Sequence, residues 1–254
     1  MAGIAIVTGA SSGLGREYVR QIVIQKPDIQ EIWLIARRRE KLEAVAAEFP
    51  EKNFAIFSLD LAEKESFEIL RSSLEQKKPN VEILINNSGF GKLGYFEEIP
   101  LEQEAGMVDV NIRAMVCLTH IVLPYMNSGA VIVNTCSIAA YIPNPRMTVY
   151  SSTKAFVFSF SKALRQELKR KNINVHAACP GPMDTEFLQV AEITQGKSPL
   201  FDGIPRVNPA EMAEKSLKKA MRGKAVYTNK FLYKLYRVLC KIVPHNWLMK
   251  QFTA

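Results

Sequence analysis

The sequence predicts an α/β fold in which one doubly wound parallel sheet carries helices on both faces. Short apolar runs alternate with longer segments of helical periodicity from the first residues onward, which is the pattern of this fold class. The runs are rich in Ile, Val and Ala without strict alternation, as expected for strands buried on both faces. With 254 residues and 48% apolar content, the chain is long enough for one large core, so residues 1–254 are predicted to form a single domain.

Six strands are expected in chain order, and helices fill the intervals. The pattern after the first strand predicts a helix over 14–25, and the pattern after the third predicts one over 66–76, capped by Ser66 or a residue just before it. The strands are expected at 3–9, 31–37, 53–59, 81–87, 129–135 and 173–179.

Two segments depart from the alternating pattern. Residues 183–208 have weak periodicity and contain Gly196, Pro199, Gly203 and Pro205. This pattern predicts a long substrate loop outside the core. Residues 229–251 form a basic amphipathic tail, in which a helix is expected to end near Pro244. The fold is therefore a single domain with a C-terminal helical extension.

The positive charge belongs to the C-terminal part of the chain. From Pro209 onward there are ten basic and two acidic residues, which equals the net charge of +8 for the whole chain. The remainder is near neutral and shows no basic stripe, so no nucleic-acid partner is expected. The tail is expected to pack over the substrate loop or a neighbouring subunit, or to make weak peripheral contact with an anionic membrane surface. Its sequence leaves these alternatives open.

The four cysteines are widely spaced and form no metal-ligand pattern with the histidines. We therefore expect reduced thiols, no metal and an intracellular, cytoplasmic protein. The first ten residues already read as a strand that runs into a glycine turn, so export is not expected. No run of 18 or more apolar residues occurs, and no membrane-spanning helix is predicted.

The segment "TGASSGLG", residues 8–15, joins the first strand to the first helix. Glycines here permit a tight turn and let backbone N–H groups approach a pyrophosphate at the positive end of the helix. The spacing G-x-x-x-G-x-G differs from the commonest dinucleotide fingerprint, but its place after an N-terminal strand favours a Rossmann-type cofactor site. The candidate cofactor-binding residues of this turn are Gly9, Ser11, Ser12, Gly13, Leu14 and Gly15.

The second strand ends in "IARRRE", which places arginines about 20 residues beyond the glycine turn. A fold that prefers NAD usually has an acid there to hold the ribose 2′-hydroxyl. Guanidinium groups instead match a phosphate through paired hydrogen bonds. Arg37 and Arg38 therefore predict a preference for NADP(H), and at least one of the three arginines, 37 to 39, is expected to be only a solvated helix start.

The segment "YSSTK" places Tyr150 and Lys154 four residues apart at the start of a helical pattern. Residues at this spacing share a helix face, so the cation can act on the phenol. Because a tyrosine normally titrates near pH ~10, a fixed lysine would have to favour the phenolate for the group to exchange protons near neutral pH. A lone pair of this kind is usually chance, so the other motifs must decide.

Together, "TGASSGLG", "NNSG" at 86–89, Asn111, Ser137 and "YSSTK" resemble the classical short-chain dehydrogenase/reductase family. The likeness extends to about Thr185, and the motifs occur in the family's order. The resemblance implies a Rossmann-type sheet in a three-layer αβα sandwich. It also implies an oxidoreductase that acts on CH–OH groups with a nicotinamide cofactor.

The resemblance implies roles for four catalytic residues. Tyr150 would donate or accept the proton, and Lys154 would lower the pKa of Tyr150 and hold the nicotinamide ribose. Ser137 would hydrogen-bond the substrate oxygen, and Asn111 would position a water that links Lys154 to solvent. These roles agree with the chemistry, since hydride transfer to a carbonyl develops negative charge on its oxygen.

Further cofactor contacts are implied by the family pattern. Asp60 and Leu61 would lie at the adenine, and the "NNSG" motif would lie near the cofactor, with Ser88 in place of the usual alanine. The segment "PGPMDT" would meet the nicotinamide. The implied residues are Asp60, Leu61, Asn86, Asn87, Gly89, Pro180, Gly181, Met183 and Thr185.

The expected substrate is a hydrophobic small molecule, because five apolar residues are expected to line the pocket. The first interpretation is an NADP(H)-dependent hydroxysteroid or bile acid dehydrogenase in lipid metabolism. A 3-oxoacyl thioester reductase and a non-catalytic NADP-binding regulatory protein are the alternatives, and the resemblance implies a homodimer or homotetramer. The expected pocket residues are Tyr141, Met147, Met183, Phe187 and Leu188.

Overall fold

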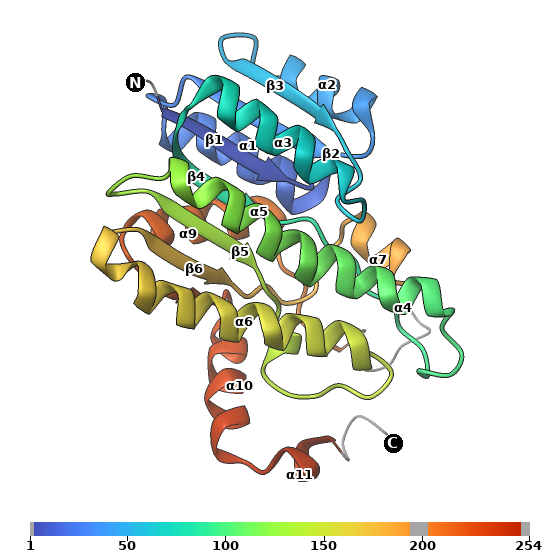
Figure 1. Ribbon diagram of the computed structural model, residues 1–254. Helices are drawn as coiled ribbons and strands as arrows, with labels where there is room; N and C mark the ends of the chain where they lie inside the picture. The colour runs from blue at the N-terminus through green and yellow to red at the C-terminus, as the bar shows by residue number, and fades with distance from the viewer. Residues whose placement is uncertain (1–2, 194–202, 250–254) are drawn as a thin grey trace.

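In the computed structural model, which describes residues 3–193 and 203–249, a parallel sheet of seven strands has the order β3-β2-β1-β4-β5-β6-β7 (Figure 1). This order confirms the predicted Rossmann-type fold. The β2 and β3 strands are added on one side of β1, and the chain then crosses back so that β4 to β7 are added on the other side. The six expected strands all form, and β7 is an addition whose two residues are too few to give a periodic signal. The strands are β1 (Gly3–Thr8), β2 (Glu31–Ala36), β3 (Asn53–Ser58), β4 (Asn80–Asn86), β5 (Val131–Thr135), β6 (Asn174–Ala178) and β7 (Val226–Tyr227).

Helices cover both faces of the sheet and complete the three layers (Figure 1). The α3, α5 and α6 helices lie on one face, where α3 packs against α5 and α6 against β6. The α1 and α9 helices pack against each other on the opposite face. The main helices are α1 (Gly13–Gln25), α2 (Arg39–Ala47), α3 (Glu65–Lys77), α4 (Leu101–Val108), α5 (Ala114–Val122), α6 (Thr148–Leu168) and α9 (Pro209–Met221).

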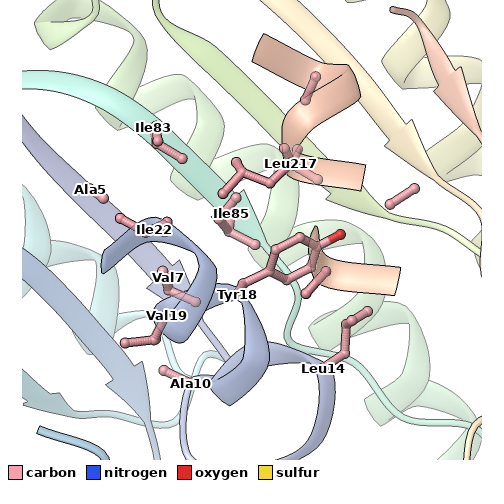
Figure 2. Close-up of a cluster of buried hydrophobic side chains, with 14 of the residues drawn as sticks. Ala5, Val7, Ala10, Leu14, Tyr18, Val19, Ile22, Ile83, Ile85 and Leu217 are labelled. Carbon is pink, nitrogen blue, oxygen red and sulfur yellow. The ribbon is translucent and has the colours of Figure 1, made fainter. Parts of the chain in front are cut away.

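The core between α1, α9 and the sheet holds the first strand and helix in place (Figure 2). Val7 of β1 and Ile85 of β4 are fully buried against Tyr18 of α1. The Tyr18 hydroxyl is also fully buried, and it shares a 2.8 Å hydrogen bond with Ser216 of α9. Since an unpaired buried hydroxyl would be costly, this bond fixes how α9 sits on α1. The glycine turn that follows β1 is thereby positioned from both sides.

The start of α3 differs from the prediction. The helix begins at Glu65, its N-cap position is Lys64, and no side chain caps it there. Ser66 instead lies inside the first turn and donates a 2.6 Å hydrogen bond to the Asp60 carbonyl oxygen. The serine therefore holds the loop that follows β3, so the predicted capping role of Ser66 is wrong.

Among the described residues one helical run, 101–125, is long and apolar enough to cross a membrane by length and composition, because an 18-residue window within it has a mean hydropathy of 1.4. The sequence criterion missed it because charged residues interrupt its apolar runs. In this structure 39% of that window is buried, and Leu118 and Val122 of the run pack in the core. These contacts are those of a core helix, which passes the same test.

The predicted loop and the predicted tail both contain a helix that was not expected, α7 in the loop and α11 in the tail. Within the loop, α7 (Glu186–Val190) forms a short helix, and a parallel bridge joins Met183 to Val207. The tail forms α10 (Phe231–Ile242), which ends just before Pro244 as predicted, and α11 (His245–Met249). In Figure 1 α10 projects away from the sheet. Residues 194–202 of the predicted loop and 250–251 of the predicted tail lie outside the described residues.

Candidate active site

A cavity of about 750 Å³ lies at the carboxyl ends of the strands, where β1 and β4 are neighbours. In open α/β sheets ligands bind at this switch point. The cavity is lined by the glycine turn, by the ends of β2 to β6, and by residues of α6, α7 and α10. Of the cofactor-binding residues predicted in the sequence, those that line it are Gly9, Ser11, Ser12, Gly13, Leu14, Arg37, Arg38, Asp60, Leu61, Asn87, Gly89, Tyr150, Lys154, Pro180, Gly181, Met183 and Thr185.

The glycines of the turn are required by geometry. Gly9 and Gly13 have φ angles of 64° and 52°, which other residues adopt at a cost. Gly15 does not line the cavity; a Cβ atom at this residue would lie 2.0 Å from the Gly9 carbonyl oxygen. Gly15 therefore lets α1 approach the strand end closely, while Gly9 and Gly13 shape the open side of the turn.

Asn87 ties three strand ends together beneath the turn. Its amide nitrogen donates to the Thr8 carbonyl oxygen at 3.2 Å, and its amide oxygen accepts from the Thr135 hydroxyl at 3.1 Å. Asn86 points the other way, into a buried network with Thr119 and Asn134. The expectation that Asn86 lies near the cofactor is therefore wrong, because strand alternation turns its side chain into the helical layer.

The arginines after β2 differ in their surroundings. Arg39 pairs with Glu43 one turn along α2, as expected for a solvated helix start. Arg37 is 78% exposed and lies 3.8 Å from Asp60. Arg38 reaches toward the glycine turn, where its guanidinium lies 3.3 Å from the Ser12 hydroxyl oxygen. Arg38 is thus the arginine best placed at the cavity.

A carboxylate of α7 occupies the basic site beside the glycine turn. Glu186 accepts hydrogen bonds from Arg38 at 2.6 Å and from Lys41 at 2.5 Å. These two cations, Arg38 first, lower the pKa of Glu186 to about 2. We call Arg38, Lys41 and Glu186 the basic clasp. Sequence reasoning missed Lys41 and Glu186, because they lie 145 residues apart and neither belongs to a motif.

The reacting end of the cavity brings together Ser137, Tyr150 and Lys154. Ser137 follows β5, whereas Tyr150 and Lys154 lie on the first turns of α6 and are 7% and 5% exposed. The Ser137 side chain lies close enough to the Tyr150 phenol to favour a lower pKa of that group. The Lys154 ammonium donates to the Thr135 carbonyl oxygen at 3.0 Å and lies 5.7 Å from the centre of the tyrosine ring.

Burial is the largest influence on the pKa values of Tyr150 and Lys154. It raises the pKa of Tyr150 above its ordinary value, and the neighbouring Ser137 side chain offsets only part of this rise. Burial also lowers the pKa of Lys154. The expectation that Lys154 lowers the pKa of Tyr150 is not met here, because the amine is held at the Thr135 carbonyl. The phenol is therefore in its proton-donating form.

Asn111 lies behind the cavity rather than on its wall. It belongs to the π-helical turn η1 (Asp109–Arg113) between α4 and α5, and such turns occur frequently at functional sites. Its amide bonds both backbone groups of Phe90 and donates to the Thr153 hydroxyl at 3.0 Å. A Cβ atom at Gly89 would lie 2.8 Å from the Asn111 amide oxygen and 3.4 Å from the Lys154 nitrogen. Asn111 thus packs beside Lys154, and its part in proton relay stays a prediction.

The substrate end of the cavity has apolar walls from several elements. Four of the five predicted pocket residues line it: Met147, Met183, Phe187 and Leu188. Phe187 packs against the Tyr150 ring with a centroid distance of 5.5 Å. The exception is Tyr141, which is buried and shares a 2.6 Å hydrogen bond with Thr228. Its prediction as a pocket residue is wrong, because its hydroxyl finds a partner in the core.

The α10 helix packs over the predicted substrate loop, which confirms that expectation for the tail, and it supplies a cavity wall whose individual residues sequence reasoning missed. Leu232, Tyr233 and Tyr236 line the cavity, and the Tyr233 hydroxyl donates a 2.5 Å hydrogen bond to the Pro205 carbonyl oxygen. A Cβ atom at Gly181 would lie 2.3 Å from the Tyr233 ring. The available signal was the pair of tyrosines at positions i and i+3, Tyr233 and Tyr236, whose hydroxyls interrupt the apolar and basic pattern of the helix.

Comparison with known families agrees with this geometry. The family model described as short chain dehydrogenase matches residues 3–196. The chain belongs to the short-chain dehydrogenase family. The predicted enzyme class, an oxidoreductase that acts on CH–OH groups, follows from this membership.

Individual members of the short-chain dehydrogenase family match the chain at moderate identity. Serine 3-dehydrogenase of Agrobacterium fabrum is 34% identical over 216 residues, which are 82% of this chain and 83% of that protein. Very-long-chain 3-oxoacyl-CoA reductase of Laccaria bicolor is 37% identical over 180 residues, which are 67% of this chain and only 52% of that protein. A solved short-chain dehydrogenase from Sphingobium yanoikuyae in complex with NADPH has a TM-score of 0.80 and 24% identity, and the match covers 95% of this chain and 96% of that one.

The residues of this short-chain dehydrogenase fit a nicotinamide dinucleotide with a 2′-phosphate. The turn at Gly9 and Gly13 leaves open a cradle that larger side chains would narrow. Arg38 and Lys41 already hold an anionic group, the Glu186 carboxylate, and a phosphate offers the same acceptor chemistry. Among the described residues no cluster could hold a metal ion, and the four thiols are free.

Proposed function

We propose that this short-chain dehydrogenase uses NADP(H) to interconvert a secondary alcohol and a ketone on a hydrophobic small molecule. A hydroxysteroid or bile acid is the first candidate substrate. The observation that carries the proposal is that Ser137, Tyr150 and Lys154 face a cavity whose far walls are apolar.

The chain's own residues support this chemistry at the substrate oxygen. The bound cofactor supplies or accepts the hydride. Ser137 and Tyr150 line the same end of the cavity, so a carbonyl oxygen bound between their hydroxyls would meet two donors where negative charge develops. Tyr150 is protonated and buried, and it can pass its proton to that oxygen. Lys154 lies one helical turn further along α6, and its positive charge can stabilise the phenolate that Tyr150 becomes when it gives up its proton.

A 3-oxoacyl thioester is the second candidate substrate. The relative named very-long-chain 3-oxoacyl-CoA reductase, at 37% identity, favours it. The wall formed by Leu232, Phe187 and Ile204 suits either an acyl chain or a sterol ring system, because it is apolar and draws on separate segments.

A substrate panel tests the proposal. The purified chain is incubated with NADPH and ketones, or with NADP and alcohols, from the steroid, bile acid and acyl thioester classes, and NADPH absorbance at a fixed protein concentration is followed. Turnover of a hydrophobic member, with kcat/KM higher for NADPH than for NADH, is the expected result. Binding of NADPH without turnover of any class would instead identify a non-catalytic NADP-binding regulatory protein. Equal use of both cofactors would contradict the assigned preference.

Replacement of Glu186 by Gln is expected to strengthen NADPH binding by about threefold to tenfold and to leave NADH binding unchanged. The carboxylate competes with a 2′-phosphate for Arg38 and Lys41, and NADH carries no such phosphate. Fluorescence titration of each cofactor gives the two dissociation constants. Glu43→Gln, which frees Arg39 on the outer side of α2, is the matched control and should change neither constant. An unchanged or weaker affinity of Glu186→Gln for NADPH would contradict a role of the basic clasp in cofactor binding.

A further inference from the structure

The α10 helix has an exposed apolar face that nothing in the described chain covers. At 100° per residue, the exposed apolar residues fall within one continuous stripe of the helix surface. The end residues of this stripe, Phe231 and Ile242, are 79% and 76% exposed, and Trp247 of α11 extends the apolar surface at 61%. We call this surface the α10 stripe. Its members on α10 are Phe231, Leu232, Leu235, Val238, Leu239 and Ile242.

A cationic face runs beside the α10 stripe. Lys230, Lys234, Arg237 and Lys241 follow one another at helical spacing, and none forms an ion pair with any residue in 3–193 or 203–249. No acidic residue follows Glu214 in the sequence. The third face of the helix, with Tyr233 and Cys240, is buried against the body of the protein. The helix thus has one packed face, one exposed apolar face and one exposed basic face.

This charge pattern favours an anionic bilayer over a second copy of the chain as the occupant of the α10 stripe. Two copies joined through α10 would bring two basic faces together without an acid on either helix to compensate. A bilayer with anionic lipids offers apolar depth for the stripe and negative headgroups for the flanking cations at the same time. Long lysine side chains can also extend from the helix to the headgroup level.

We infer that α10 and α11 dock the protein on the surface of an anionic phospholipid bilayer, with the α10 stripe inserted among the headgroups and acyl ends. The docking itself does not depend on the reaction. A consequence for the substrate rests on the proposed function. Leu232 is 53% exposed in the stripe and also lines the cavity, so the cavity opens at the docked surface. A hydrophobic substrate dissolved in the bilayer would reach it without crossing water.

Co-sedimentation of the full chain with vesicles tests the docking. One vesicle type is phosphatidylcholine alone, and the other is phosphatidylcholine with about a quarter phosphatidylglycerol. We expect binding to the mixed vesicles that is at least about tenfold stronger than to the neutral ones and that weakens at high salt, because each basic residue near an anionic surface contributes roughly fivefold.

Two variants and two controls separate the components. Phe231→Ser/Leu235→Ser/Ile242→Ser removes exposed apolar contacts without touching the cavity wall, and Lys234→Glu/Lys241→Glu reverses two charges. Each should lower vesicle binding at least about tenfold, with an unchanged unfolding temperature. The controls, Ile24→Ser/Ile69→Ser on α1 and α3 and Lys169→Glu/Arg170→Glu after α6, make similar changes elsewhere and should bind like the unmodified chain.

Three results would overturn the inference. The first is no vesicle binding by the unmodified chain at millimolar lipid. The second is that the unmodified chain binds both vesicle types equally and that the variants bind as strongly as the controls. The third is a stable dimer without lipid binding that the triple serine variant converts to a monomer, since a second copy would then occupy the stripe. Because none of these readouts involves turnover, an inactive substrate panel would leave the docking result intact, and failed docking would leave the proposed reaction intact.

Discussion

Replacement of Tyr150 by Phe is expected to lower kcat for ketone reduction by at least about 10³-fold, and to leave the dissociation constant for NADPH within about threefold. The ring is held by its contact with Phe187 and by the close approach of Gly91, where a Cβ atom would lie 2.8 Å from the ring. Phenylalanine keeps those contacts and removes only the hydroxyl. The variant therefore loses the proton donor while the shape of the cavity stays the same.

Single-turnover reduction and NADPH fluorescence titration measure the two quantities for Tyr150→Phe separately. Tyr125→Phe is the matched control and should retain full turnover, because Tyr125 packs against the core and does not line the cavity. Unchanged kcat in Tyr150→Phe would show that the proton comes from another group, and it would remove the central residue of the proposed reaction.

Replacement of Lys154 by Met is expected to weaken NADPH binding by about tenfold or more and to lower kcat by at least about 10²-fold. Lysine is 5% exposed at this position, and methionine has similar length and flexibility. The variant should therefore fold, with an unfolding temperature equal to or above that of the unmodified chain, because removal of a buried charge relieves a desolvation penalty. Loss of both binding and turnover would distinguish Lys154 from Tyr150, whose replacement affects turnover alone.

Lys162→Met is the control for Lys154→Met. Lys162 lies two turns further along α6 and is exposed over the Phe158 ring, so its replacement should leave both kinetic constants unchanged. Normal NADPH affinity in Lys154→Met would contradict a contact between this amine and the cofactor. Normal kcat with weak binding would limit Lys154 to holding the cofactor.

The sequence predicts local chemistry well, because motifs place reacting groups at fixed intervals along strands and helices. The ends of β1, β4 and β5 and the start of α6 meet because parallel strands align their carboxyl ends at one edge. Ser137 and Tyr150 could therefore be assigned to one site without coordinates. The two asparagines after β4 show the limit of such reasoning, since alternation along the strand decides which of Asn86 and Asn87 faces the cavity.

Other features depend on contacts between distant segments. The basic clasp joins α2 to α7, and no periodicity or motif marks Glu186 as the partner of Arg38. The burial of Tyr141 depends on Thr228, a residue 87 positions away. The pKa of Tyr150 also could not be read from the i, i+4 spacing, because the position of the Lys154 amine is set by the Thr135 carbonyl on β5. Each of these requires the distance between two elements that the sequence does not encode locally.

The cavity wall formed by α10 has a consequence for how such an enzyme can diversify. The family model ends at residue 196, so Ile204, Leu232, Tyr233 and Tyr236 lie in the part of the chain that the model does not match. The reacting hydroxyls and the glycine turn lie in the matched part. Met147, Met183, Phe187 and Leu188 of the substrate wall also lie in the matched part. The wall is therefore built from both stretches of the chain, and its α10 portion can change while the reacting groups stay constant.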